Sequence, residues 1–259
     1  MGGNTREVGR TSASRLLAVL GVFSAAQPVL TLSEIAEASE LPASTAHRLL
    51  GELVEWGALE RTSDGHYQVG LRLWRIGSLA PQQRDLRAVA LPFMEDLYAA
   101  THENVQLAIR DGKKALYLDK IGGTRSVDTV TKVAGRLPLH ATGVGKIILA
   151  FSEPELLHLV VEDGLERCTP HTITMPGRLA ETLRRVRADH VAYSREEMTM
   201  GAASVAAPIF GVNAQLLASL AIVAHSSSDV ERFAPAVRTA ALSVGRRLAD
   251  LSAPVSARR

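Results

Sequence analysis

Residues 31–60 constrain the fold of this chain most, because two apolar-periodic stretches stand there with a proline between them. The first stretch, residues 33–39, is expected to form a short helix with Ser33 as its N-cap. The second, residues 44–56, has the apolar spacing of a longer helix, and Pro42 keeps the two apart. Two amphipathic helices joined by so short a turn predict a helix-turn-helix.

The flanking segments complete a winged domain. Residues 14–25 place apolar side chains at helical spacing and predict a preceding helix. Residues 59–69 predict a hairpin, because Leu59 and the Tyr67/Val69 pair flank Ser63-Asp64-Gly65, a strong turn signal. A winged helix-turn-helix is therefore expected over residues 1–70, followed by a linker helix over 71–85.

The pattern changes beyond residue 103, where strand-like runs begin. Residues 104–121 form two such runs around Asp111-Gly112, which predicts an antiparallel hairpin. Helix-like and strand-like segments then alternate, with a central strand expected at 216–225 and a closing helix at 229–252. This mixture indicates an α+β domain over residues 86–259, assigned to effector binding and oligomerisation.

Length and composition agree with two ordinary globular domains. The chain has 259 residues, of which 46% are hydrophobic and 22% charged, so it can bury a core in each domain. Its single cysteine, Cys168, excludes an internal disulfide and a multi-cysteine zinc site. No signal-peptide pattern or long apolar run occurs, so a cytoplasmic protein without membrane attachment is expected.

The second helix of a helix-turn-helix fits the major groove of DNA, which predicts binding to double-stranded promoter DNA. Residues 1–84 carry eight arginines and eight acidic residues, so a basic face depends on where these lie. A plain amphipathic hairpin that only packs remains the alternative. The candidate DNA contacts are base-reading Thr45, His47 and Arg48, phosphate-binding Ser44, wing residues Arg61 and His66, and Arg10 and Arg15 in a leading arm.

A glycine-rich turn at residues 143–146 resembles a phosphate-binding loop but lacks its defining residues. His140 stands where a glycine is required, and Ile147 where serine or threonine binds magnesium. The turn could still present backbone amides to a carboxylate, or it could be a plain tight turn.

Other signals of enzymatic chemistry are weak. Cys168 and His171 lie close enough for a thiolate–imidazole pair, but no third group is evident to orient the base. The histidines lack metal-binding spacing, so His140 and His190 are expected to be structural. No catalytic residue, metal or cofactor is therefore predicted.

Taken together, these segments resemble the isocitrate lyase regulator (IclR) family of bacterial transcription factors from about Ser14 to Leu251. The marks are LSEIAEASELPASTAHRLLGELVEWGALE, YQVGLRLWRIGSLA, RLPLHATGVGKIILAF and VAYSREEMTMGAASVAAPIF, in that order. The resemblance implies a winged helix-turn-helix, a linker helix, and a GAF-like effector domain with a curved antiparallel sheet flanked by helices. It also implies homodimers or homotetramers on palindromic operators, with repression as the commoner sign of regulation.

The resemblance further implies a small-molecule pocket beside the loop HATGVGK. The matching positions are Leu137, Gly143, Val144, Ser194, Ala202, Ser204, Ala221 and Val223.

Family members that bind small keto acids carry an acid, a cysteine and two serines where this chain has Ser194, Ser204, Ala221 and Val223. With fewer polar partners for a compact charged ligand, a larger and more apolar effector is expected, such as an aromatic carboxylic acid. The Gly143 and Val144 amides and Ser204 would be its polar contacts. Three alternatives stay open: a pocket filled by side chains, a constitutive DNA-binding protein whose C-terminal domain only oligomerises, and an enzyme that uses Cys168.

Overall fold

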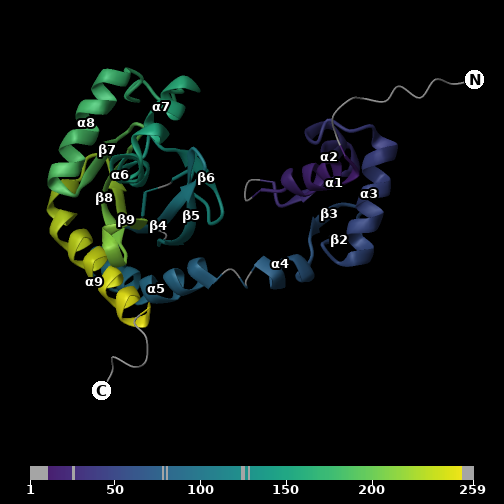
Figure 1. Cartoon of the computed structure of the whole chain (residues 1–259), viewed down its shortest axis with the longest axis horizontal. Helices are drawn as coiled ribbons and strands as arrows, with labels where there is room; N and C mark the ends of the chain where they lie inside the picture. The colour runs from purple at the N-terminus through teal and green to yellow at the C-terminus, as the bar shows by residue number, and fades with distance from the viewer. Residues whose placement is uncertain are drawn as a thin grey trace, which may run out of the picture. The chain divides into compact units, whose positions relative to one another are not determined.

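The computed structural model describes residues 11–24, 27–77, 79, 81–123, 126–127 and 129–252 (Figure 1). The chain divides after Pro81 into two compact units, each with its own contacts. Within this described part, no helix is both long and apolar enough to cross a membrane.

The N-terminal unit is a winged helix-turn-helix, as predicted. It packs α1, α2 and α3 around buried leucine, isoleucine and valine side chains and closes with an antiparallel sheet in the order β1-β3-β2. The strand β1 was not expected, because two residues are too short for a period-two pattern. The elements are α1 (Ser12–Gly21), β1 (Val29–Leu30), α2 (Leu32–Ala38), α3 (Ala43–Trp56), β2 (Leu59–Arg61), β3 (Tyr67–Val69) and α4 (Leu71–Gly77).

The cap of α2 is Thr31 and not Ser33, which corrects the prediction. The Glu34 amide donates to Thr31 Oγ1 at 3.2 Å, and the Thr31 amide donates to the Glu34 carboxylate at 2.7 Å. This capping box satisfies two helix-end amides reciprocally, whereas a cap at Ser33 would leave them exposed. At the end of α3, Gly57 adopts φ 81°, the left-handed conformation that a helix-ending glycine takes readily.

The C-terminal unit contains the predicted mixture of strands and helices. The hairpin at 104–121 and the central strand at 216–225 are both present. The linker helix expected over residues 71–85 ends at Gly77, and Pro81 begins a second helix, since proline fits a first helical turn. The elements are α5 (Pro81–Thr101), β4 (Asn104–Asp111), β5 (Lys114–Ile121), β6 (Arg136–Pro138), α6 (Gly143–Phe151), α7 (Pro154–Glu162), α8 (Pro176–Asp189), β7 (Ala192–Arg195), β8 (Ala202–Phe210), η1 (Val212–Ala214), β9 (Leu216–His225), η2 (Val230–Phe233) and α9 (Ala234–Ser252).

These strands form one curved antiparallel sheet in the order β6-β5-β4-β9-β8-β7, with helices on both faces (Figure 1). On one face, here called the apolar face, Leu107, Val205 and Leu220 pack against α5 and α9. On the other, the pocket face, Ala206 and Ala221 pack against α6, and α7 and α8 complete the layer. The predicted α+β fold class is confirmed.

Candidate functional site

Helix α3 presents the polar side chains predicted to read DNA. Ser44, His47 and Arg48 are exposed and Thr45 is half-buried, while the opposite side of the helix fills the core. The Arg48 guanidinium pairs with the Glu52 carboxylate one turn further along α3, and the two side chains are 60% and 50% exposed. Such a solvent-exposed pair is weak, so Arg48 is free to exchange Glu52 for another partner.

The wing carries one clear cationic group. Arg61 on β2 is exposed, and its guanidinium carbon lies 5.9 Å from the centre of the Tyr67 ring. His66 is half-buried, and its Nδ1 lies 3.0 Å from the Asp64 carboxylate without the alignment of a hydrogen bond. The Asp64 carboxylate would repel a DNA phosphate at His66, so Arg61 is the better candidate of the two for binding a phosphate.

Of the two arginines predicted to lie in a leading arm, the structure describes only one. Arg15 lies within α1, not in an arm, because the helix begins at Ser12 and Thr11 caps it through the Ser14 amide. Its side chain is half-buried, and its Nε has no acceptor among the described residues. Arg10 lies outside the described residues.

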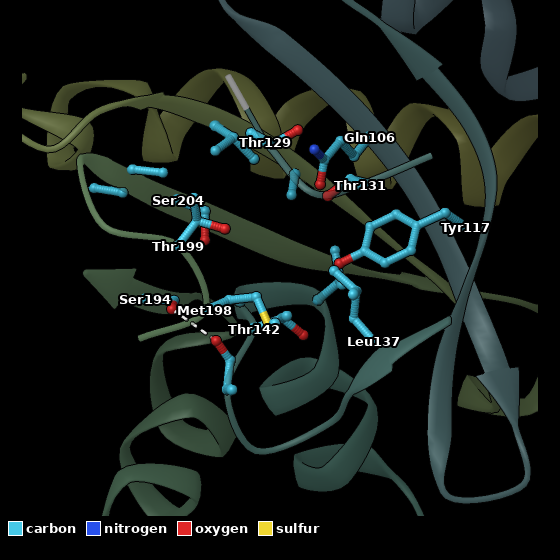
Figure 2. A pocket seen from close by; sticks show the side chains of 17 residues that line it. Gln106, Tyr117, Thr129, Thr131, Leu137, Thr142, Ser194, Met198, Thr199 and Ser204 are labelled. Carbon is cyan, nitrogen blue, oxygen red and sulfur yellow. Dashed lines mark hydrogen bonds between the residues drawn. The ribbon is translucent and has the colours of Figure 1, made fainter. Parts of the chain in front are cut away.

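A cavity lies between the pocket face of the sheet and the N-terminus of α6, and all eight predicted effector residues line it (Figure 2). Its volume is about 40 Å³. Further polar side chains that were not predicted line the wall, and none of the lining residues that the structure describes is charged. The additional polar side chains are Gln106, Tyr117, Thr129, Thr131, Thr142 and Thr199.

The N-terminus of α6 is built to meet a polar group in this cavity. Thr142 caps the helix by accepting from the Gly145 amide at 3.1 Å, and no acceptor in the described structure faces the amides of Gly143 and Val144. A side chain at Gly143 would place Cβ 2.7 Å from Ser204 Oγ, so glycine allows the helix end to approach β8. Unpaired amides at a helix N-terminus attract anions.

A buried ion pair holds the loop between β7 and β8 against α6. Lys146, 1% exposed, donates from Nζ to the Tyr193 carbonyl at 3.0 Å and to the Glu197 carboxylate. Burial lowers the pKa of Lys146, and the Glu197 charge opposes this shift. The Glu197 carbonyl also accepts from Thr172 Oγ1 at 2.7 Å. The same loop brings Met198 into the cavity wall.

Two hydroxyl groups of the cavity already have partners. Ser194 Oγ donates to the Ala141 carbonyl at 3.2 Å, the dashed contact in Figure 2. Burial strongly raises the pKa of Tyr117, and side-chain hydrogen bonds to Thr142 and Thr131 partly offset the shift. The phenol is therefore neutral and tied into the wall.

The enzymatic alternative finds little support in this geometry. Cys168 Sγ has the Glu166 carbonyl as its hydrogen-bond partner at 3.8 Å, and burial raises the pKa of the thiol, which disfavours a nucleophilic thiolate. His171 instead faces Glu196, at 3.7 Å from its carboxylate. Among the described residues, no group of three or more potential ligands could hold a metal ion.

Comparison with known proteins identifies the class of this chain. Residues 12–63 match the IclR helix-turn-helix domain, and residues 79–246 match the bacterial transcriptional regulator IclR C-terminal domain. Both descriptions belong to transcriptional regulators and not to enzymes.

Among curated relatives, the regulator KipR of Bacillus subtilis is 32% identical over 90% of this chain and 94% of its own. The transcriptional repressor IclR of Escherichia coli is 30% identical over 82% and 78%. An IclR homolog of Microbacterium hydrocarbonoxydans, solved in complex with 4-hydroxybenzoate, superimposes with a TM-score of 0.87 at 32% identity, over 92% of this chain and 99% of that one. The chain belongs to the IclR family of bacterial DNA-binding transcriptional regulators.

Proposed function

We propose that this regulator represses transcription from a palindromic operator and that an aromatic carboxylic acid controls its occupancy. The observation that carries the proposal is the uncharged cavity closed at one end by the free Gly143 and Val144 amides. An anion there needs no basic side chain, because helix-end amides supply both the hydrogen bonds and the positive potential. The similar protein of M. hydrocarbonoxydans, which binds 4-hydroxybenzoate, supports this ligand class.

The proposed ligand requires the cavity to widen. A cavity of about 150 Å³ accommodates benzene, and the present one measures about 40 Å³. Side chains thus fill most of the site in this form, and binding must displace some of them. Met198 is the best placed to move, since it is half-buried, unbranched and carried by a loop.

For DNA, Thr45, His47 and Arg48 are proposed to read base edges, with Ser44 at a phosphate. Arg61, His66, Arg15 and Arg10 would add phosphate or minor-groove contacts. Such a regulator acts in the cytoplasm, where its operator lies.

A second copy of the chain is proposed to cover the exposed apolar residues of α4 together with Leu79, which follows that helix. Leu71, Trp74 and Leu79 are 62%, 65% and 70% exposed, which is unusual for three large apolar side chains so close in sequence. A homodimer, or a homotetramer of two such dimers, would place two α3 helices on the two half-sites of a palindrome.

Effector binding would act by shifting the populations of two assembly arrangements that differ in the spacing of the paired recognition helices. A coupling free energy of about 1–3 kcal/mol between effector and DNA is enough for a useful switch.

The test is binding of the full-length protein to the intergenic DNA beside its own gene, at physiological salt, with unrelated DNA of equal length as the control. Preferential binding that 4-hydroxybenzoate weakens is the expected result. Preferential binding that no aromatic acid alters would favour a constitutive DNA-binding protein. Equal, salt-sensitive binding to both fragments would contradict a specific operator in that region.

The base-reading assignment has its own test. Arg48→Ala should weaken binding to the specific fragment by about 1–3 kcal/mol and relax selectivity at one base pair. Glu52→Ala removes the intrahelical partner and serves as the matched control. A loss that is the same for every sequence would assign Arg48 to a phosphate instead.

A further inference from the structure

Gln106 is a buried amide in the cavity wall that lacks a partner. It lies on β4, paired with Ala221 of β9, and its side chain is on the pocket face and only 3% exposed. Its Nε2 is fully buried and meets no acceptor in the described part of the protein. Figure 2 shows the amide directed into the cavity, across from Thr142 in this view.

The neighbouring side-chain amide on the same strand has a hydrogen-bond acceptor, unlike that of Gln106. Asn104 is also buried on the pocket face, but its Nδ2 donates to the Val127 carbonyl at 2.8 Å. Buried donors are almost always satisfied, so one that faces a ligand cavity without a partner marks a place where a ligand can supply the acceptor.

The position of Gln106 sets the shape of that ligand. Ser204 lies on β8 and approaches Gly143, and β9 separates β8 from β4. Two inter-strand spacings amount to roughly 10 Å between the backbones, and the glutamine side chain shortens the gap. An aromatic ring with a carboxylate at one end and an oxygen at the other spans such a gap.

We propose that Gln106 is the specificity-determining residue of the effector pocket and donates a hydrogen bond to a second oxygen on the ring, opposite the carboxylate held at α6. This inference rests on the proposed function, since it requires an aromatic acid in the cavity. A site that offers a buried donor rejects an analogue without the acceptor, because the donor is then left unpaired. The expected ligands are therefore hydroxylated aromatic acids and not benzoate itself.

The experiment is calorimetric titration of the full-length protein with benzoate and with 4-hydroxybenzoate. Wild type should bind 4-hydroxybenzoate at least tenfold more tightly. Gln106→Leu, which keeps the approximate volume but has no donor, should bring the two affinities within about twofold of each other. Gln106→Met provides a second variant with the same expectation, and thermal unfolding verifies that each is folded. Thr199→Val, which removes a different hydroxyl from the wall, should change both affinities by a similar factor.

The outcomes separate the two proposals. Equal wild-type affinities, or a preference for the hydroxylated acid that survives both Gln106 variants, would overturn the role of Gln106 and leave the aromatic-acid effector in place. A wild-type protein that binds neither acid would overturn the proposed effector class, and the inference with it.

Discussion

The two faces of the six-stranded sheet differ in what they bury. The apolar face packs Leu107, Val205 and Leu220 against α5 and α9, and its buried carboxylate, Asp119, pairs with Arg87 at 2.7 Å. The pocket face buries many polar groups, and several of them line the cavity. The buried polar residues are Asn104, Gln106, Thr131, Thr142, Lys146, Ser194, Glu197, Ser204 and Ser219.

The difference indicates that the two faces of the sheet have different roles within one domain. Dense apolar packing stabilises a fold at no cost in unsatisfied hydrogen bonds. Buried polar groups are expensive unless every donor and acceptor has a partner, and on the pocket face Gln106 Nε2 and Glu197 Oε2 have none among the described residues. The apolar face therefore supplies stability, and the pocket face gives up part of it for ligand recognition.

The largest effect should come from breaking the buried ion pair of the pocket face. Lys146→Met leaves the Glu197 carboxylate buried without its cation, which is expected to cost about 3–5 kcal/mol of unfolding free energy. Urea denaturation of the full-length protein measures it.

The matched control is the ion pair of the apolar face. Asp119→Asn should cost about 1 kcal/mol or less, because Arg87 is 58% exposed and stays hydrated alone. Pairing Lys146→Met with Glu197→Gln should recover part of the loss. Equal costs for Lys146→Met and Asp119→Asn would show that the two pairs are not differently buried.

A second comparison sets an apolar side chain against a hydroxyl on the other face. Leu220 is fully buried on β9, and Leu220→Ala should cost about 2–5 kcal/mol through the cavity that it leaves. Ser204→Ala should leave stability within about 1 kcal/mol but weaken carboxylate binding. A larger loss of stability for Ser204→Ala than for Leu220→Ala in urea denaturation would refute the different roles of the two faces.

Most of the fold could be predicted from local patterns. The helix-turn-helix and the hairpin at 104–121 follow from periodicity and turn residues, which act over a few positions. The cap was misplaced from Thr31 to Ser33 because both can accept an amide, and only the reciprocal bond from Glu34 decides between them. The strands β1 and β6 were missed because their two and three residues leave no pattern to read.

The pocket was predicted in part, through positions that the family resemblance supplied. Gln106 was missed although its strand alternates, with Val105 and Leu107 on one face and Asn104 and Gln106 on the other. Alternation alone suggests that the polar residues face water. They are buried because segments later in the chain cover that face, namely α6 and the residues around Val127 and Thr131. Periodicity within one strand cannot report a covering element.

The smallest effect should be a loss of folding stability at alkaline pH, caused by the buried Tyr117 phenol of the pocket face. Burial holds the pKa of Tyr117 well above its ordinary value of about 10. Above pH 10 the unfolded chain loses this proton while the folded protein keeps it, so stability falls as the pH rises. The slope approaches about 1.4 kcal/mol per pH unit for a single group.

Tyr117→Phe removes this slope, since phenylalanine has no proton to lose. The stability advantage of wild type over Tyr117→Phe should therefore shrink by about 1 kcal/mol between pH 10 and pH 11, while the other titrating groups cancel in the difference. Tyr193 is the control, because it packs beside the apolar face and is only half-buried, with its pKa raised by burial as well. Tyr193→Phe should change the slope less. If the wild-type advantage over Tyr117→Phe stays constant across this range, the phenol is accessible to solvent, and the pocket face is more open than its buried polar groups imply.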